Sequence, residues 1–200
     1  MSMTYPIIAS EKCAVCGLNV NVTIIASYST SGCALDGRPR TLGADIIPMW
    51  IQHCPGCGYC SPDISKSPKD TSIVRSQEYQ SIVSGGSIAS FYKASALIKE
   101  SEKDYESASF LYLRSAWMHE DYNEFEAARE MRSEALRCFD MVGEDGIEYN
   151  LHRMELLRTS GKIAAAIELY NNMNDSPKEY RGFLERIKLY LDAGSSEPDR

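Results

Sequence analysis

The feature that most constrains this chain is a pair of C-x-x-C-G motifs, Cys13–Gly17 and Cys54–Gly58. Two residues between paired cysteines let one tight turn present both sulfurs to the same metal ion. Zn²⁺ binds four thiolates in a tetrahedron, and the glycine after each motif tolerates the positive φ of such a turn. The pattern therefore predicts one structural zinc ion bound by Cys13, Cys16, Cys54 and Cys57. Redox or disulfide use of the same cysteines is the alternative.

Two neighbouring residues offer weaker alternatives as ligands. Cys57 and Cys60 form a further C-x-x-C, but Ser61 follows it in place of glycine. His53 directly precedes Cys54, and in a strand it would point to the opposite face. We interpret Cys60 and His53 as residues outside the set of ligands.

The charge of the chain argues against nucleic-acid binding. Its 200 residues carry a net charge of −7, and the basic side chains of the first 65 are Lys12, Arg38 and Arg40. A protein that binds nucleic acid non-specifically presents clustered Lys and Arg to the phosphates. The predicted zinc-binding part lacks such a cluster, so the commonest use of zinc ribbons is disfavoured.

The apolar content of the chain predicts a cytoplasmic protein without a membrane partner. Residues 1–12 contain neither the basic region nor the apolar run of a signal peptide. No segment approaches the ~18 apolar residues that a membrane span requires. In a reducing cytoplasm, metal binding is favoured over disulfide formation.

Residues 1–65 are predicted to form a small zinc ribbon. Residues 20–28 are rich in β-branched side chains and predict a strand, and residues 29–44 predict a long loop. Residues 46–53 predict a second strand that leads into Cys54. Such a unit has too small a core to fold alone, so metal binding and folding are expected to be one event.

Residues 66–192 are predicted to form a helical domain. Ser67 followed by Pro68 is typical of a helix start. Apolar residues at three- and four-residue spacing then predict amphipathic helices, of which the second covers about 88–102 and the third about 104–119. The predicted fold class is α+β, mostly α, with a small N-terminal zinc ribbon followed by antiparallel helical hairpins.

The later helices follow the same pattern. Asn123 is expected to cap the fourth helix, whose apolar stripe includes Cys138 as a core residue. Fifth and sixth helices follow, and the pair Ser176 and Pro177 is expected to begin a seventh. The last segment, 193–200, is predicted to be a disordered tail.

Small residues recur at the same distance after two of the predicted turns. Ala128 lies five residues after Asn123, and Ala166 lies five residues after Gly161. This spacing resembles the second helix of a tetratricopeptide repeat, where small residues allow helices to pack closely. We expect tetratricopeptide-like hairpins, with a generic helical bundle as the alternative.

Taken together, these motifs resemble the bacterial family called domain of unknown function 2225. The shared features are C-x-x-C-G, the Leu-Asp-x-Arg-Pro loop Leu35–Pro39, and the tryptophan-led segment Trp50–Tyr59. The resemblance covers the ribbon closely and the helices loosely. It implies a bacterial protein with a zinc ribbon fused to tetratricopeptide-like helices, and it implies no reaction. Cys60 departs from the family pattern and leaves open which cysteines of the second motif bind metal.

The leading functional hypothesis is a non-enzymatic interaction module. A zinc ribbon would make one end rigid, and the helical hairpins would present a concave surface to a protein or peptide partner. The chain contains 12 tyrosines, among them Tyr105, Tyr112, Tyr149 and Tyr170. Tyrosines suit a peptide groove, but they suit half-buried positions between helices equally well.

The alternative hypotheses are an enzyme and a nucleic-acid-binding ribbon, the second disfavoured by the acidic charge. The enzyme would use the loop that contains Cys33, Asp36 and Arg38. An Asp and Arg pair more often fixes a long loop through an ion pair, and a cysteine there is more often half-buried than reactive. His119 and His152 have no cysteine or histidine at ligand spacing, so we interpret both as surface or groove residues.

Overall fold

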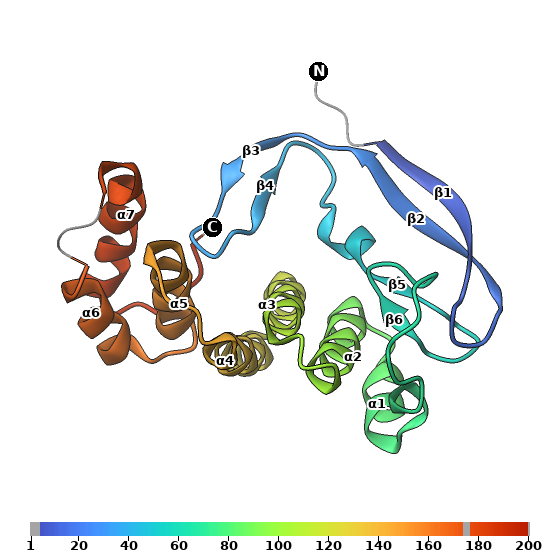
Figure 1. Ribbon diagram of the computed structural model, residues 1–200. Helices are drawn as coiled ribbons and strands as arrows, with labels where there is room; N and C mark the ends of the chain where they lie inside the picture. Colours follow the sequence, from blue (N-terminus) through green and yellow to red (C-terminus); the bar gives the residue numbers. More distant parts are fainter. Residues whose placement is uncertain (1–4, 174–176, 200) are drawn as a thin grey trace.

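The computed structural model describes residues 5–173 and 177–199. The described chain is mostly helical, with small antiparallel hairpins at its N-terminal end. This confirms the predicted class of α+β, mostly α. The helices follow one another along an arc, and the strands lie along its inner side (Figure 1). No helix in these ranges is both long and apolar enough to cross a membrane.

The N-terminal part contains three separate two-stranded antiparallel sheets. Their strands are β1 (Tyr5–Lys12) with β2 (Asn19–Ser27), β3 (Thr30–Cys33) with β4 (Pro39–Thr41), and β5 (Gln52–His53) with β6 (Cys60–Ser61). In the first sheet, Lys12 pairs with Asn19 and the register continues to Pro6 opposite Ile25, after which it shifts and Tyr5 lies opposite Ser27. Strand β2 confirms the strand predicted over residues 20–28, whereas β1 was not predicted.

Two predictions for this part were wrong. The segment 46–53 was predicted to be a strand, but it begins with a 3-10 helix, Ile47–Trp50. Pro48 explains the difference, because it lacks the N–H that a strand ladder needs and fits the first turn of a helix. The segment 29–44 was predicted to be a loop, but it contains the hairpin of β3 and β4.

Seven α-helices follow in the described chain: α1 (Gln77–Val83), α2 (Ile88–Ser101), α3 (Tyr105–Asp121), α4 (Phe125–Val142), α5 (Ile147–Thr159), α6 (Ile163–Asn171) and α7 (Arg181–Asp192). The prediction that a helix begins at Ser67 was wrong. The first α-helix instead begins after Ser76, whose side chain accepts a hydrogen bond from the Tyr79 N–H at 3.2 Å. Of the pair expected to begin the seventh helix, Ser176 lies outside the described residues.

Three connections between helices have the same geometry. Lys103, Asn123 and Gly161 have φ values of 60°, 62° and 88°, and each is the middle residue of a three-residue connection. Asn123 is thus the turn residue and not the cap of α4 that we predicted, since a cap residue has extended backbone. A buried alanine lies five residues after each turn residue, namely Ala108, Ala128 and Ala166. The small-residue pattern seen in the sequence therefore extends to a third turn.

Two hydrophobic clusters hold the elements together, and both contain residues from either side of residue 65. The larger cluster packs Leu35, Ile46 and Ile51 against helices α2 to α7. The smaller cluster packs the β1–β2 and β5–β6 hairpins against α1 and α2, through residues that include Val20 and Tyr79. The division of the chain at residue 65 stays a prediction, but the strands have no core separate from the helices.

The end of the described chain packs against the rest of the protein. Residues 193–200 were predicted to be a disordered tail, yet Ser195–Asp199 contact α5, α7 and the Leu35 loop. Asp199 is only 8% exposed. The prediction was wrong for the described residues 193–199, because polar contacts that the sequence does not reveal fix this segment.

Candidate metal centre and inner polar cluster

Each C-x-x-C-G motif forms the loop of a β-hairpin, the first between β1 and β2 and the second between β5 and β6. The two loops have the same hydrogen bonds: Gly17 N–H donates to the Cys13 carbonyl and Gly58 N–H donates to the Cys54 carbonyl, both at 2.8 Å. The glycines have φ values of 79° and 78°, which other residues adopt only with strain. This geometry is the reason that glycine follows each motif.

The two hairpins bring the four sulfurs of Cys13, Cys16, Cys54 and Cys57 within 4.8 Å of one another. Cys13 Sγ lies 3.7 Å from Cys57 Sγ, and Cys16 Sγ lies 3.5 Å from Cys54 Sγ. Four ligands at about 2.3 Å around a tetrahedral ion would place neighbouring sulfurs about 3.8 Å apart. All four thiols are free of disulfides. The cluster can therefore hold a metal ion without rearrangement of the loops.

The surroundings of the sulfurs differ in their effect on ionisation. A hydrogen bond from the Leu18 N–H lowers the pKa of Cys16 below its ordinary value. Burial raises the pKa of Cys54 and Cys57, because it disfavours their charged forms. A bound dication would offset this cost by attracting the thiolates, so metal binding and thiol deprotonation should be coupled.

The weaker ligand candidates lie outside the sulfur cluster. Cys60 is buried, and its thiol donates to the Gly58 carbonyl at 3.3 Å. Burial raises the pKa of Cys60 to about 12. The His53 ring stacks on Phe91 with a centroid distance of 4.2 Å. Both residues therefore contribute to packing.

A second cluster fixes the Leu35–Pro39 loop to the helices. Asp36 is 3% exposed, and its Oδ2 accepts hydrogen bonds from Trp117 Nε1 and Arg132 Nη2, both at 2.7 Å. Burial opposes the charge on Asp36, but the charge and hydrogen bonds of Arg132 hold its pKa below the usual range. Arg132 also donates from Nε to Glu120 at 2.8 Å. The interpretation of Asp36 as a residue that fixes the loop is supported by these contacts.

The sequence analysis did not single out the buried charges on the helices. Glu120 and Arg132 belong to this network, and Glu155 forms a two-point ion pair with Arg158 at 2.6 and 2.8 Å. Each of the four occupies the apolar stripe of its helix; Arg132, for example, lies four residues after Ala128. A charged residue on the apolar stripe of a helix is a signal that could have revealed these buried ion pairs, because burying an unpaired charge costs free energy.

Asp36 and Arg38 line one cavity, but Cys33 does not join them there as the enzyme hypothesis requires. Cys33 is exposed on β3, whereas the Asp36 carboxylate points toward the helices and is buried. Arg38 donates to Asp121, the last residue of α3, at 2.7 Å. Cys33 was expected to be half-buried, and this prediction was wrong. Cys138 is a core residue, as predicted.

The two helical histidines occupy different environments. His119 forms a hydrogen-bonded pair with Glu124 at 2.6 Å and is partly exposed. His152 lies between Phe110 and Phe139, and among the described side chains its Nε2 is the buried polar atom without a hydrogen-bond partner. Burial lowers the pKa of His152 to about 4. His152 was interpreted as a surface or groove residue, but its ring is packed between two aromatic rings of the helices.

The four tyrosines named as candidates for a groove pack within the helices. Tyr112 is in the core and donates to Glu100 at 2.5 Å, and the Tyr149 hydroxyl donates to the Phe139 carbonyl at 2.6 Å. Tyr105 and Tyr170 are partly buried and pack against the larger hydrophobic cluster. The half-buried alternative describes Tyr105, Tyr149 and Tyr170, and Tyr112 is fully buried.

Two adjoining cavities lie on the inner side of the helices, next to the end of the chain. The larger has a volume of about 530 Å³ and is lined by residues that include Phe125, Arg129, Thr159 and Pro198. The smaller measures about 220 Å³ and lies between the Leu35–Pro39 loop and the same proline. The cavities therefore flank the last described residues on both sides.

Comparisons with protein-family models, with curated proteins and with solved structures found no match. The resemblance to the family of the C-x-x-C-G and Leu-Asp-x-Arg-Pro motifs stays a hypothesis. The functional argument therefore rests on the residues and geometry of this chain.

Proposed function

We propose that this chain is a zinc-stabilised, non-enzymatic protein-interaction module of the domain of unknown function 2225 type. The observation that carries the proposal is the four-sulfur cluster formed by two β-hairpin loops. Four thiolates complete the coordination of zinc and leave no position for a substrate, which is the pattern of a structural site. The metal would hold both hairpins against α1 and α2.

The helices provide the surface for a partner. Their repeated turns and buried alanines support a tetratricopeptide-like arrangement, in which successive hairpins build one curved surface. Because the strands cover part of the inner side (Figure 1), the partner site is the cavity of about 530 Å³ that remains beside α4, and not a groove of tyrosines. The enzyme hypothesis receives no support from Cys33 and Asp36, which point into different environments.

Metal analysis of the purified chain tests the first half of this proposal. We expect about one equivalent of zinc per chain. A chain with no zinc and with four thiols that react freely under native conditions would contradict the assignment.

Partner capture from a lysate tests the second half, with the intact chain as bait. Arg129→Glu reverses a charge on the cavity wall, and Arg181→Glu reverses an exposed charge at the start of α7, away from the cavity. We expect the first change to reduce capture of a specific protein and the second to leave it unchanged. Equal capture by both variants would show that the cavity is not the interaction surface.

A further inference from the structure

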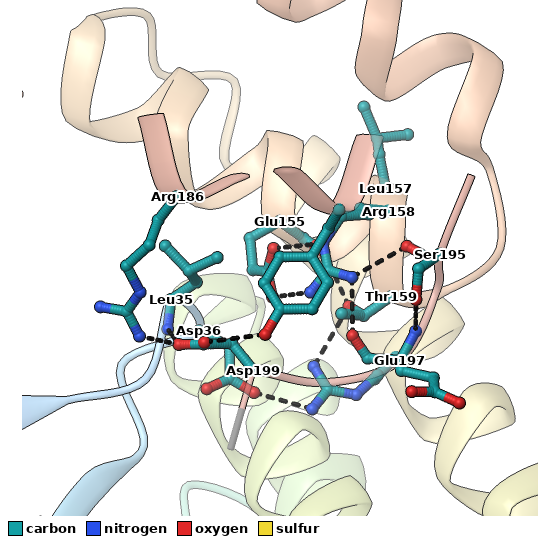
Figure 2. Close-up of polar contacts among 12 residues, drawn as sticks. Leu35, Asp36, Glu155, Leu157, Arg158, Thr159, Arg186, Ser195, Glu197 and Asp199 are labelled. Carbon is teal, nitrogen blue, oxygen red and sulfur yellow. Dashed lines mark hydrogen bonds and ion pairs between the residues drawn. The ribbon is translucent and has the colours of Figure 1, made fainter. Parts of the chain in front are cut away.

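The last described residues line the two cavities, and two of their carbonyls accept hydrogen bonds from one buried arginine. Arg158 Nη1 donates to the carbonyl of Ser195 at 2.9 Å and to the carbonyl of Glu197 at 2.6 Å (Figure 2). In an extended backbone, carbonyls two residues apart face the same side, so an extended peptide can make both contacts. Arg158 therefore contacts main-chain atoms that any extended peptide possesses.

Contacts with Glu155 and Tyr190 fix the orientation of Arg158 independently of residues 195–199. Its Nε and Nη2 form the two-point ion pair with Glu155, and its guanidinium lies over the Tyr190 ring, 4.4 Å from the centroid. Its side chain is fully buried. A rigid, buried donor that is aimed at peptide carbonyls is a pre-organised contact, which reduces the entropy cost of binding.

One side chain of the tail, Asp199, is surrounded by hydrogen-bond donors. Its carboxylate accepts from the Leu35 N–H at 3.0 Å and from Arg186 (Figure 2). It also accepts from Arg40 at 3.2 Å and from the Tyr190 hydroxyl at 3.0 Å. These donors come from the loop after β3, from β4 and from α7. In the described chain, Asp199 is the carboxylate that pairs with both Arg40 and Arg186. The pocket thus selects an acidic side chain.

The tail contributes little apolar packing and does not fill the space around it. The Glu197 side chain points outward and is exposed, while Ser195, Ser196 and Pro198 are partly exposed. Cavities of about 530 and 220 Å³ remain on its two sides. A segment held by polar contacts in a larger cleft can be exchanged for another segment that makes the same contacts, because little hydrophobic free energy is lost.

We propose that this cleft is a binding site for an extended acidic peptide of a partner protein, and that residues 195–199 occupy it in competition with that peptide. This inference rests on the proposed interaction function and names the chemistry of the partner. The required features are an aspartate or glutamate that contacts Arg40 and Arg186, and a preceding extended backbone that contacts Arg158. Residues 195–199 of the same chain would lower the apparent affinity for the partner, because only molecules with an empty cleft can bind it.

The test uses the full chain and a fluorescent peptide with the sequence of residues 194–199 and blocked ends. Asp199→Asn weakens the binding of the chain's own residues 195–199 in the cleft, because a buried charged contact is lost. We therefore expect this variant to bind the peptide about tenfold or more tightly than the unaltered chain does. A peptide with Asn in place of its aspartate should bind at least about tenfold more weakly. Adding Arg186→Gln to the Asp199→Asn protein should remove the gain.

Two results overturn the inference: no binding of the peptide to any variant, or equal binding of the aspartate and asparagine peptides. If Asp199→Asn does not fold, the unaltered chain decides the question at high peptide concentration, where the aspartate peptide alone should bind. Concentration-dependent dimers of the Asp199→Asn protein that exchange tails would assign the cleft to a second copy and would also overturn it. A negative peptide result leaves the proposed function intact, because partner capture is measured on the intact chain without the peptide.

Discussion

Replacement of Asp36 by asparagine should show how strongly the buried ionic cluster joins the strands to the helices. Asparagine keeps the shape of the side chain but removes the charge, so Arg132 keeps Glu120 as its only ionic partner in the described chain. Trp117 Nε1, Arg132 Nη2 and the Arg38 N–H all donate to the Asp36 carboxylate. The side-chain amide nitrogen of the new asparagine would therefore face a donor and lose that hydrogen bond. Breaking a buried pair in this way costs about 3–5 kcal/mol.

The effect can be measured by thermal denaturation at neutral pH with the metal present. For a chain of this length, 1 kcal/mol corresponds to about 2–4 °C, so the Tm of Asp36→Asn should fall by about 6–20 °C. Asp121→Asn is the matched control, because Asp121 pairs with Arg38 at 2.7 Å but is 39% exposed. Exposed pairs contribute about 0–1 kcal/mol. A similar Tm for the two variants would refute the reasoning that the buried cluster fixes the loop.

The remaining predictions concern the metal, a buried histidine and a helix contact. Cys57→Ser should lose zinc by metal analysis, whereas Cys60→Ser should retain it, because only the first sulfur belongs to the cluster; zinc loss in both would contradict this. The pKa of His152 is lowered to about 4 in the folded chain and is about 6.5 in the unfolded chain. The neutral histidine therefore contributes stability above pH 6.5, and about 3 kcal/mol of it is lost as the pH falls toward 4. Denaturation at pH 7 and pH 5 should show this loss, and His152→Phe should reduce it; an unchanged pH dependence would argue against a buried neutral histidine. Ala128→Leu should cost about 1–3 kcal/mol by overpacking the α3–α4 contact, and a Tm equal to that of the original chain would show that the helices are not closely packed there.

The sequence predicted well whatever depends on neighbouring residues. The two C-x-x-C-G motifs correctly predicted tight turns, because turn geometry and the glycine requirement are local properties. Helices α2 and α3 were predicted to within about two residues at each end, since their apolar residues recur at helical spacing. The start at Ser67 failed because the same local signal of serine and proline occurs in loops, and no packing surface followed it.

The elements that the sequence missed depend on distant partners. Strand β1 forms through its pairing with β2, yet its side chains are largely exposed on both faces, and Ile8 is 78% exposed. It therefore lacks the alternation of apolar and polar residues that identifies a half-buried strand. The partners of Asp36 lie 81 and 96 residues along the chain, at Trp117 and Arg132. No local pattern pairs residues at that distance, although the charge on the apolar face of α4 indicates that Arg132 needs a partner.

The strands are attached to the helices at two places of different chemistry, and this changes what metal loss should do. The sulfur cluster holds the hairpins next to α1 and α2, in the cluster that contains Val20 and Tyr79. The Asp36 network holds the other end next to α3 and α4, and it contains no metal ligand. Metal removal should therefore loosen α1 together with the hairpins, while the Leu35–Pro39 loop and the arginine-lined pocket around Asp199 stay in place. The sequence alone suggested that a small ribbon would unfold as a unit, but the hydrophobic clusters divide the N-terminal part between α1 and α2 on the one hand and the following helices on the other.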